Sequence, residues 1–359
     1  MKKIGILTLP FHYNCGGRIQ AFALQEYLRG IGHDAHIVNL QFSPPKASKG
    51  NQKIKTFIKW CIRSYLPKDV FNESIQPVTP DLYPSDNLAQ LNEMFDGFVV
   101  GSDQVWRKQY ARQFLSSFFL GFTAKHQVKR VSYAASFGVS DWQFTQEETD
   151  TLAKLVANFN AVSVREDSAV KLCQEFFSVD AKHVIDPAML LDKETYLKLM
   201  KQEHTQSFNG GLVYYILDMS DSMHNLVRYY SQELAMTPFT ASIRASRATS
   251  PWAERPYPRV ANWVKSFTTA NFVITDSFHG TVLSILFNRP FIALGNTKRG
   301  NTRFLSLLKT FNLEDRLLPY EGGINLEKAN TPIDWETVNE ILRHKREESQ
   351  EFLRLALKD

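Results

Sequence analysis

Short apolar runs alternate with segments of helical periodicity along almost the whole chain, and this alternation constrains the fold more than any other feature. In the first unit, the apolar run KKIGILTL is typical of a buried strand and DAHIVNLQF of a second strand. Between them, residues 18–32 carry apolar side chains at helical spacing, ending at Gly30 and Gly32. Repeated alternation of this kind predicts an α/β fold, with parallel sheets covered by helices on both faces.

The alternation falls into two series joined by the polar stretch 192–211. Further strands are expected at FDGFVVG, KRVSYAASFG, NAVSVR and KHVIDPAML in the first series, and at GLVYYILD, TPFTASI, NFVITD and PFIAL in the second. Helices are expected near 146–159, 168–177, 222–235, 259–268 and 280–288. A chain of 359 residues is also long for a single core. We therefore expect two Rossmann-like domains facing a cleft, residues 1–205 and 206–335, with a helix over 336–359 packed across them.

The positive charge of the chain is concentrated in one segment. The net charge is +5, but seven lysines and arginines and no acidic residue lie between Lys46 and Lys68, so the remainder is close to neutral. This pattern argues against nucleic-acid binding, because basic residues should then spread over a face. Residues 54–65 would form an amphipathic helix within a basic insert at about 46–92. It is either an ordinary surface helix or a membrane-surface helix that would meet a lipid-linked acceptor.

The N-terminal apolar run is too short for a signal peptide, and no later run approaches the length of a membrane span. The sequence therefore predicts a cytoplasmic protein. If the basic helix binds lipid, the protein would be peripheral at the inner face of the cell membrane.

Several predicted strands end in polar turns. Ligands of open α/β sheets bind beyond the carboxyl ends of the strands, glycines let the backbone approach them, and helix N-termini attract anions. Three of these turns, at 14–18, 101–104 and 165–168, therefore hold candidate binding residues. The candidates are Asn14, Gly16, Gly17, Arg18, Ser102, Asp103, Gln104 and Arg165.

Each turn also has a purely structural interpretation. The Asn14 turn can be only a tight connection, and Asp103 can cap a short helix. Residues 165–168 can cap the next helix with Asp167 or Ser168, which leaves Arg165 unexplained. We interpret Asp186-Pro187 as a structural turn.

The segment FVITDSFHGTVLSILF, residues 272–287, predicts a strand, a tight turn and a helix that hold His279 rigidly. A structural imidazole is the alternative, but the strand-end position favours a general acid or base. Downstream, Lys298, Arg299 and Arg303 lie with two glycines in the turn 295–303. This turn is either a cradle for a phosphate or carboxylate or a solvated loop.

Motifs at these turns resemble the polysaccharide pyruvyl transferase family, in its S-F-H-G form. The resemblance covers nearly the whole chain and is carried by NCGGRIQAFALQ, FVVGSDQVW, SYAASFG, SVREDS, VIDPAMLL and VITDSFHGTVLSILFNRPF. It implies the two-Rossmann architecture of GT-B glycosyltransferases. It also implies transfer of the pyruvyl group of phosphoenolpyruvate to two hydroxyls of a sugar in a surface or capsular polysaccharide precursor of a bacterium. The product would be a cyclic ketal, and the catalytic histidine would be His279.

One position departs from the family pattern, because Ser277 stands where many members have an arginine. The cation that holds the donor is then either absent or supplied from elsewhere, with Arg165, Arg18 and the group Lys298, Arg299 and Arg303 as candidates. We assign Arg165, Lys298, Arg299 and Arg303, with Ser277 and the amides of Gly280 and Thr281, to the donor. His279 would act as general acid or base, and Asp103 would orient or deprotonate the acceptor. The turns at 14–18 and 102–104 would bind the acceptor.

No cofactor and no metal site are expected, so activity should survive EDTA. Two other interpretations remain open. One is a GT-B glycosyltransferase that uses a sugar nucleotide. The other is a non-catalytic member of a polysaccharide assembly complex.

Overall fold

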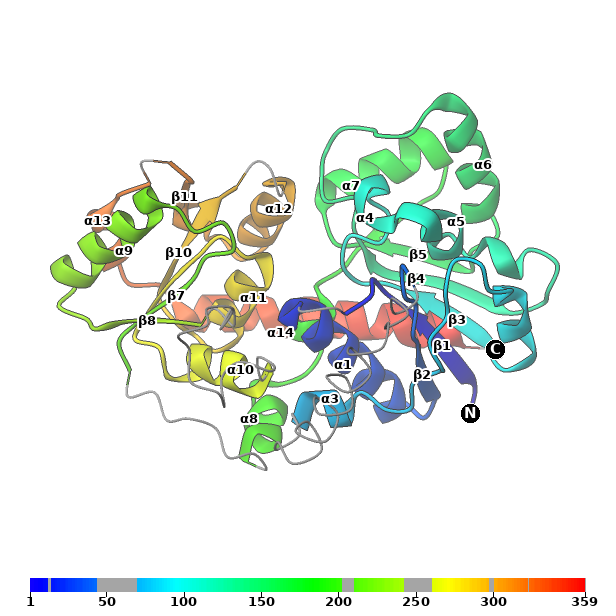
Figure 1. Cartoon of the computed structure of the whole chain (residues 1–359), viewed down its shortest axis with the longest axis horizontal. Helices are drawn as coiled ribbons and strands as arrows, with labels where there is room; N and C mark the ends of the chain where they lie inside the picture. Colours follow the sequence, from blue (N-terminus) through cyan, green and yellow to red (C-terminus); the bar gives the residue numbers. More distant parts are fainter. Residues whose placement is uncertain are drawn as a thin grey trace, which may run out of the picture.

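The computed structural model describes residues 1–11, 14–43, 70–201, 210–241, 260–296, 300–321 and 323–358. Two parallel sheets stand side by side, one in the N-terminal half of the chain and one in the C-terminal half (Figure 1). This arrangement confirms the predicted α/β fold class of two Rossmann-like units. The expected boundary at residue 205 lies outside the described residues.

The N-terminal sheet has the strand order β2-β1-β3-β4-β5-β6, and all neighbouring strands are parallel. Its strands are β1 (Lys3–Leu7), β2 (Asp34–Val38), β3 (Gly97–Val100), β4 (Lys129–Ala135), β5 (Ala161–Val164) and β6 (Lys182–His183). The C-terminal sheet has the order β11-β10-β9-β7-β8 and is also parallel. Its strands are β7 (Leu212–Tyr215), β8 (Pro238–Thr240), β9 (Phe272–Thr275), β10 (Phe291–Gly295) and β11 (Leu317–Pro319).

Helices cover both sheets and follow the strands as the alternation predicts. Those of the N-terminal half are α1 (Cys15–Gly30), α3 (Val70–Ser74), α4 (Lys108–Ala111), α5 (Leu115–Phe118), α6 (Gln146–Val156), α7 (Asp167–Leu172) and α8 (Lys193–Lys201). Those of the C-terminal half are α9 (Asp221–Glu233), α10 (Val260–Thr269), α11 (Phe278–Leu286), α12 (Thr302–Thr310), α13 (Leu326–Asn330) and α14 (Trp335–Leu357). The described residues also include short 3-10 or π turns: η1 (Leu88–Glu93), η2 (Arg112–Phe114), η3 (Gly121–Thr123), η4 (Cys173–Phe177), η5 (Pro187–Met189) and η8 (Glu314–Arg316).

Capping residues explain where the two helices nearest the site begin. Asn14 accepts a hydrogen bond from the Gly17 amide at 3.0 Å, so α1 starts at Cys15 rather than at residue 18. Ser277 caps α11 in the same way, so that helix starts at Phe278 rather than at residue 280. His279 therefore lies in the first turn of a helix and not, as predicted, in the turn before it.

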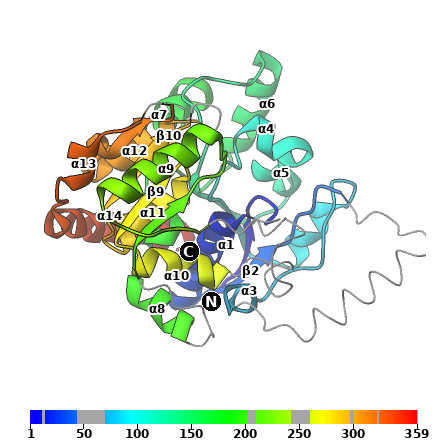
Figure 2. The same ribbon diagram turned by 60° about the vertical axis from the view of Figure 1, so that its left-hand side comes forward.

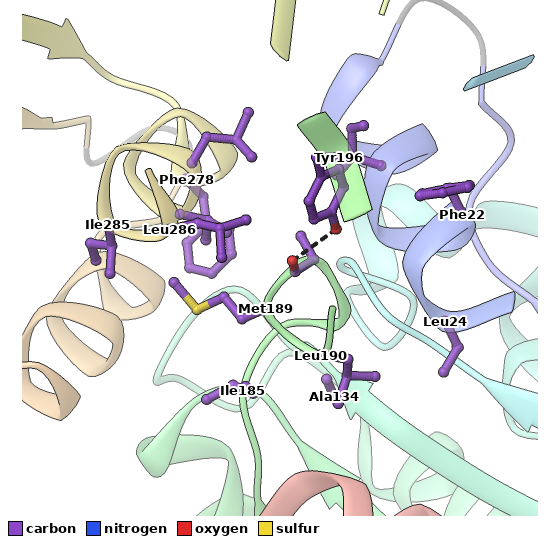
Figure 3. Packing of buried hydrophobic residues seen from close by; sticks show 14 of the residues in the cluster. Phe22, Leu24, Ala134, Ile185, Met189, Leu190, Tyr196, Phe278, Ile285 and Leu286 are labelled. Carbon is purple, nitrogen blue, oxygen red and sulfur yellow. Dashed lines mark hydrogen bonds between the residues drawn. The ribbon is translucent and has the colours of Figure 1, made fainter. Parts of the chain in front are cut away.

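A hydrophobic core joins the two halves. It contains Ile4 and Ile6 from the N-terminal sheet together with Val213 and Val273 from the C-terminal sheet. Figure 3 shows part of it, where Met189 lies beside Phe278 and Leu286 of α11. Tyr196 of α8 is hydrogen-bonded to the residue before Met189, because its hydroxyl donates to the Ala188 carbonyl at 2.8 Å (Figure 3). The halves are thus packed together rather than joined by a linker alone.

The last helix, α14, runs behind the molecule from the C-terminal sheet to the N-terminal sheet (Figure 1). Near its end, the Gln350 carbonyl accepts from the Tyr27 hydroxyl at 2.9 Å, and the Leu357 carbonyl accepts from the Lys2 ammonium at 2.6 Å. The last turns of α14 are therefore hydrogen-bonded to α1 and to Lys2, the residue before β1.

The predicted basic insert at about 46–92 is only partly described, because residues 44–69 lie outside the described residues. The remainder holds the short helices α3 and η1. Within the described parts of the chain, no helix combines the length and the apolar character that crossing a membrane requires.

Candidate active site

The predicted site residues that the structure describes lie where the carboxyl ends of the two sheets face each other, in the region where open α/β sheets bind ligands. From the N-terminal sheet come the start of α1, the turn after β3 and the turn after β5. From the C-terminal sheet comes the start of α11, which follows β9. Gly16 of α1 touches the ring of His279, so the two halves meet at the site itself.

His279 is held by its own helix and by two residues of the other half. Its side chain is 8% exposed, and its Nε2 atom lies 3.5 Å from Asp186 Oδ2. Its Nδ1 atom lies against Gly16, where an added Cβ would approach Nδ1 to 2.2 Å. A larger residue at position 16 would therefore displace the imidazole. The glycine that we predicted for the acceptor side lies against the predicted catalytic ring.

Asp186 is the centre of the charged cluster, although its sequence context indicated only a structural turn. Its Oδ2 atom accepts from Arg165 Nη1 at 2.6 Å and lies 3.5 Å from Ser102 Oγ. Its Oδ1 atom accepts from the Ala188 amide at 2.9 Å, so the residue also caps the turn η5. Burial acts to raise the pKa of Asp186, but His279 and Arg165 overcome this and hold it well below its usual range. The carboxylate is therefore ionised at neutral pH.

Arg165 is surrounded by carboxylates and stacked on an aromatic ring. Besides Asp186, its guanidinium lies 3.6 Å from Asp103 and 3.7 Å from Glu166. Its Cζ atom lies 4.3 Å from the centre of the Phe278 ring. Burial acts to lower the pKa of Arg165, but the carboxylates of Asp186, Glu166 and Asp103 outweigh it and raise the pKa. Arg165 is thus a permanently charged and rigidly positioned group.

Arg303 brings a second guanidinium to the same ring, at 5.5 Å from the centre of Phe278. It lies buried in the first turn of α12, and not in the solvated loop that was one interpretation of 295–303. Burial, helped by the charge of Arg165, lowers the pKa of Arg303 to about 10, so it remains cationic at neutral pH. Lys298 and Arg299, the other two predicted cations, lie outside the described residues.

Asp103 faces the N-terminus of α1. Its Oδ2 atom accepts from the side-chain Nδ2 of Asn14 at 3.3 Å, and its Oδ1 atom accepts from the backbone amide of Gln104 at 2.9 Å. Its φ of 69° lies in the left-handed region, which a non-glycine residue seldom occupies. Such backbone geometry clusters at functional sites. Asp103 and Asn14, predicted separately for the acceptor, therefore form one group beside Arg165.

The other residues predicted for the acceptor side differ in burial and in the groups that they contact. Gly17 belongs to the capped first turn of α1. Ser102 is fully buried, and its hydroxyl donates to the Ala134 carbonyl at 2.9 Å. Gln104 accepts from Arg107, a buried arginine that the sequence interpretation overlooked, at 2.7 Å. Arg18 is half-buried, with its guanidinium 5.7 Å from the centre of the Phe11 ring.

The expected amide contacts of Gly280 and Thr281 with the donor need correction. The Gly280 amide donates to Ser277 Oγ at 3.4 Å, and the Thr281 amide donates to the Ser277 carbonyl at 3.0 Å. Both amides are therefore used inside the helix that Ser277 caps. Gly280 packs against Thr275, where an added Cβ would approach the threonine Oγ1 to 2.4 Å. Its role in the structure is close packing.

Two further residues at the site have no signal of their own in the sequence. Gln20 accepts from the Ser102 amide at 2.9 Å and donates to Thr8, which fixes the turn after β3. Glu166 is buried next to Arg165 and accepts from the Ser136 hydroxyl. Burial raises the pKa of Glu166.

In the part of the chain that the structure describes, no group of three His, Cys, Asp or Glu residues could hold a metal ion.

Over its whole length, the chain is similar in fold to solved structures of two epimerases and a glycosyltransferase. It is similar to a UDP-N-acetylglucosamine 2-epimerase from Rickettsia bellii, at 8% identity and a TM-score of 0.56, over 99% of this chain and 96% of that one. It is similar to the corresponding epimerase from Methanocaldococcus jannaschii, at 11% identity and a TM-score of 0.53, over 98% of each chain. A glycosyltransferase from Rickettsia africae matches at 12% identity and a TM-score of 0.52, over 98% of this chain and 99% of that one. At these identities, the likeness shows the fold alone.

The sequence itself matches one family model. No curated protein matches the chain. The model of the polysaccharide pyruvyl transferase family covers residues 14–298, which include Asn14, Asp103, Arg165, Asp186 and His279. On this match, the chain is a transferase enzyme and belongs to the polysaccharide pyruvyl transferase family.

Proposed function

We propose that the enzyme moves the pyruvyl group of phosphoenolpyruvate to two hydroxyls of a sugar in a surface or capsular polysaccharide precursor, forming a cyclic ketal. The observation that carries the proposal is the single Asp186 carboxylate shared by Arg165 and His279. Arg165, a fixed cation, and His279, a potential proton donor, therefore lie beside the same carboxylate oxygen. A small anion that must be protonated on carbon needs both groups.

The reaction requires two proton movements. One proton adds to the methylene carbon of phosphoenolpyruvate, which makes the neighbouring carbon electrophilic. The first sugar hydroxyl attacks this carbon and loses its proton, and the second hydroxyl then replaces the phosphate as the C–O bond to phosphate breaks. The two hydroxyls release two protons. One compensates for the proton that the methylene carbon takes up to become a methyl group, and the other leaves with the phosphate. The enzyme must therefore supply one acid and one base in turn.

We assign the protonation of the methylene carbon to His279. Asp186 compensates the positive charge when the ring carries the additional proton, and it fixes the ring relative to Arg165. The guanidiniums of Arg165 and Arg303 lie near each other because both pack on the Phe278 ring. If Arg165 binds the donor carboxylate and Arg303 binds its phosphate, the reacting double bond would lie beside the His279 imidazole. Ser277 contributes by capping α11, which carries His279.

We assign the acceptor to the group around Asp103. The Asp103 carboxylate can take a proton from a sugar hydroxyl, and the exposed amide of Asn14, bonded to it, can bind a neighbouring hydroxyl. Gly16 and Gly17 form the backbone next to this pair, and Arg18 lies at its edge. The chemistry uses no cofactor, so the reaction should proceed in EDTA.

Incubation of the purified chain with phosphoenolpyruvate and a panel of galactosides and mannosides tests the proposal. We expect release of phosphate and a product heavier by one pyruvate less one water. His279→Ala should reduce the rate by about 10²–10⁴-fold. His224→Ala, which removes an exposed histidine of α9, should leave it unchanged. Turnover of a nucleotide sugar instead would favour a glycosyltransferase, and no turnover with binding of the glycan would favour a non-catalytic member.

A lipid-linked acceptor requires that the basic segment 46–68 binds membranes. That segment lies outside the described residues. The proposal of a cytoplasmic enzyme at the inner face of the membrane is tested by co-sedimentation with anionic vesicles. Binding that is lost at high salt would support it. Absence of binding at low salt would leave a free oligosaccharide as the acceptor.

A further inference from the structure

A hydrogen bond crosses between the two halves immediately behind Arg165. The amide of Asp167, the first residue of α7, donates to the hydroxyl of Ser306 in α12 at 2.9 Å. Helices α7 and α12 lie next to each other in both views (Figures 1 and 2), and Ser306 is only 2% exposed. The first turn of a helix in the N-terminal half is thus completed by a side chain of the C-terminal half.

The local sequence of α7 does not supply this contact. We expected Asp167 or Ser168 to be the N-cap, but the N-cap residue is Glu166, and its side chain makes no capping bond. Asp167 Oδ1 accepts from the Ser168 amide at 2.8 Å, and the Ala169 amide donates to the Glu166 carbonyl at 3.1 Å. These bonds leave the Asp167 amide for a partner outside the segment, because the first amides of a helix have no partner within it.

A second path connects Ser306 with Arg165. His183 Nε2 lies 3.3 Å from Ser306 Oγ and 3.1 Å from the Arg165 carbonyl oxygen. Burial lowers the pKa of His183, so the ring is neutral at neutral pH and bonds as a neutral imidazole. Ser306 is therefore connected to the main chain on both sides of Glu166, directly at the Asp167 amide and through His183 at the Arg165 carbonyl.

Helix α12 contacts the charged cluster one turn earlier as well. Arg303 precedes Ser306 by three residues, so both side chains lie on the same face of the helix. Arg303 approaches the Phe278 ring, and Ser306 approaches α7. Movement of α12 relative to the N-terminal half would change both contacts together.

We propose that Ser306 is a positioning residue for Arg165. Its hydroxyl, provided by the C-terminal half, completes the first turn of α7 and so fixes the main chain that carries the guanidinium. The structural part of this proposal stands on the contacts alone. Its consequence for the donor rests on the proposed function, in which Arg165 binds phosphoenolpyruvate.

Hydrogen exchange of the full chain, followed by mass spectrometry of peptides covering 165–172, tests the structural part without any ligand. Loss of a helix cap of about 1 kcal/mol corresponds to about fivefold faster exchange, which we expect for Ser306→Ala. The matched control is Thr310→Ala, because the Thr310 hydroxyl donates to the Ser306 carbonyl within α12 at 2.9 Å. This control should leave the exchange of 165–172 unchanged.

The near-isosteric Ser306→Cys provides a second variant that preserves packing, because a thiol is only a weak acceptor. It should accelerate exchange in the same peptides. Exchange at the wild-type rate in both Ser306 variants would overturn the proposal, and so would equal acceleration by Thr310→Ala.

Titration calorimetry with phosphoenolpyruvate tests the consequence for the donor. We expect Ser306→Ala to bind it about fivefold more weakly than the wild type, with circular dichroism unchanged. Unchanged affinity, despite faster exchange, would overturn the role in positioning Arg165. If the wild type itself does not bind phosphoenolpyruvate, the proposed function fails, whereas the exchange experiment still decides the contact between α7 and α12.

Discussion

At the scale of single residues, the site depends on close approaches between the two halves that only particular side chains permit. Gly16 is the clearest case, because its α carbon lies against the His279 ring and leaves no space for a methyl group. Asp186 provides the other constraint, since one of its oxygens contacts Arg165 and faces His279. Position 16 and position 186 thus determine where the imidazole lies relative to the donor cation.

Gly16→Ala should therefore slow the enzyme without removing any functional group. The new Cβ would lie 2.2 Å from His279 Nδ1, which forces the ring to move by about 1 Å, and a displacement of this size costs about 100-fold in rate. Steady-state kinetics with the best acceptor of the panel would measure the loss in kcat.

Gly30→Ala is the matched control for this prediction. Gly30 ends the same helix, and a Cβ placed on it would meet no atom within 4 Å. Its kcat should equal that of the wild type. Wild-type kcat in Gly16→Ala would show that His279 is not positioned by α1 during turnover.

The sequence placed His279 correctly next to a helix start, because the strand-turn-helix pattern is local. Asp186 was assigned to a turn, which it does cap, but its two charged partners lie 21 and 93 residues away in the chain. Such a pairing depends on the order of the strands, and no local pattern contains that order. The same polar strand-end rule that selected Arg165 would have selected Asp186, since it lies in the turn after β6, three residues beyond His183.

At the scale of elements, one residue connects the start of α1 with the acceptor group. Asn14 accepts from the Gly17 amide and donates to Asp103. Its oxygen serves the helix, and its nitrogen serves the site. Substitutions at this position can therefore separate the stability of α1 from the chemistry of Asp103.

Asn14→Asp and Asn14→Ser should differ in activity, although both keep an oxygen that caps α1. The free energy of unfolding of the serine variant should stay within about 0.5 kcal/mol of the wild type. The aspartate places a second carboxylate beside Asp103, and repulsion of about 1.4 kcal/mol would lower its stability by that amount and make it about tenfold slower than the serine variant. Denaturant titration and initial rates measure the two effects, and equal rates would contradict a role for the Asn14–Asp103 pair.

Most elements were predictable from apolar periodicity. Helices α4, α5, α8, α12 and α13 and strand β11 were not predicted, and α8 lies in the stretch 192–211 that was interpreted as a polar connection. The other errors occurred at the ends of elements. The starts of α1 and α11 were predicted three and two residues late, since Asn14 and Ser277 cap the helices before the apolar pattern begins. Helix α7 was expected to continue to residue 177, but it changes to a π turn at Cys173. Its missing local cap could not be foreseen, because the partner, Ser306, belongs to the other half.

At the scale of the whole molecule, the two sheets share one core and one terminal helix. The alternation predicted two units, but it contained no information on how closely they pack. The shared core includes buried residues of both sheets. It also includes Leu353 of α14, whose exposure is 0%. A site formed by residues of both halves requires this packing, because Gly16 of α1 and His279 of α11 belong to different halves.

The chain should consequently unfold as one unit, although its length alone suggests two. In scanning calorimetry, we expect a single transition whose calorimetric and van't Hoff enthalpies agree. Leu353→Ala should lower the stability of the whole transition by about 2–5 kcal/mol, since it opens a cavity in the shared core. Leu355→Ala, two residues further along the same helix and 61% exposed, should change it by less than about 0.5 kcal/mol. Two separate transitions, with only one displaced by Leu353→Ala, would show that the halves are energetically independent, and the contact between Gly16 and His279 would then have to form anew each time the halves close.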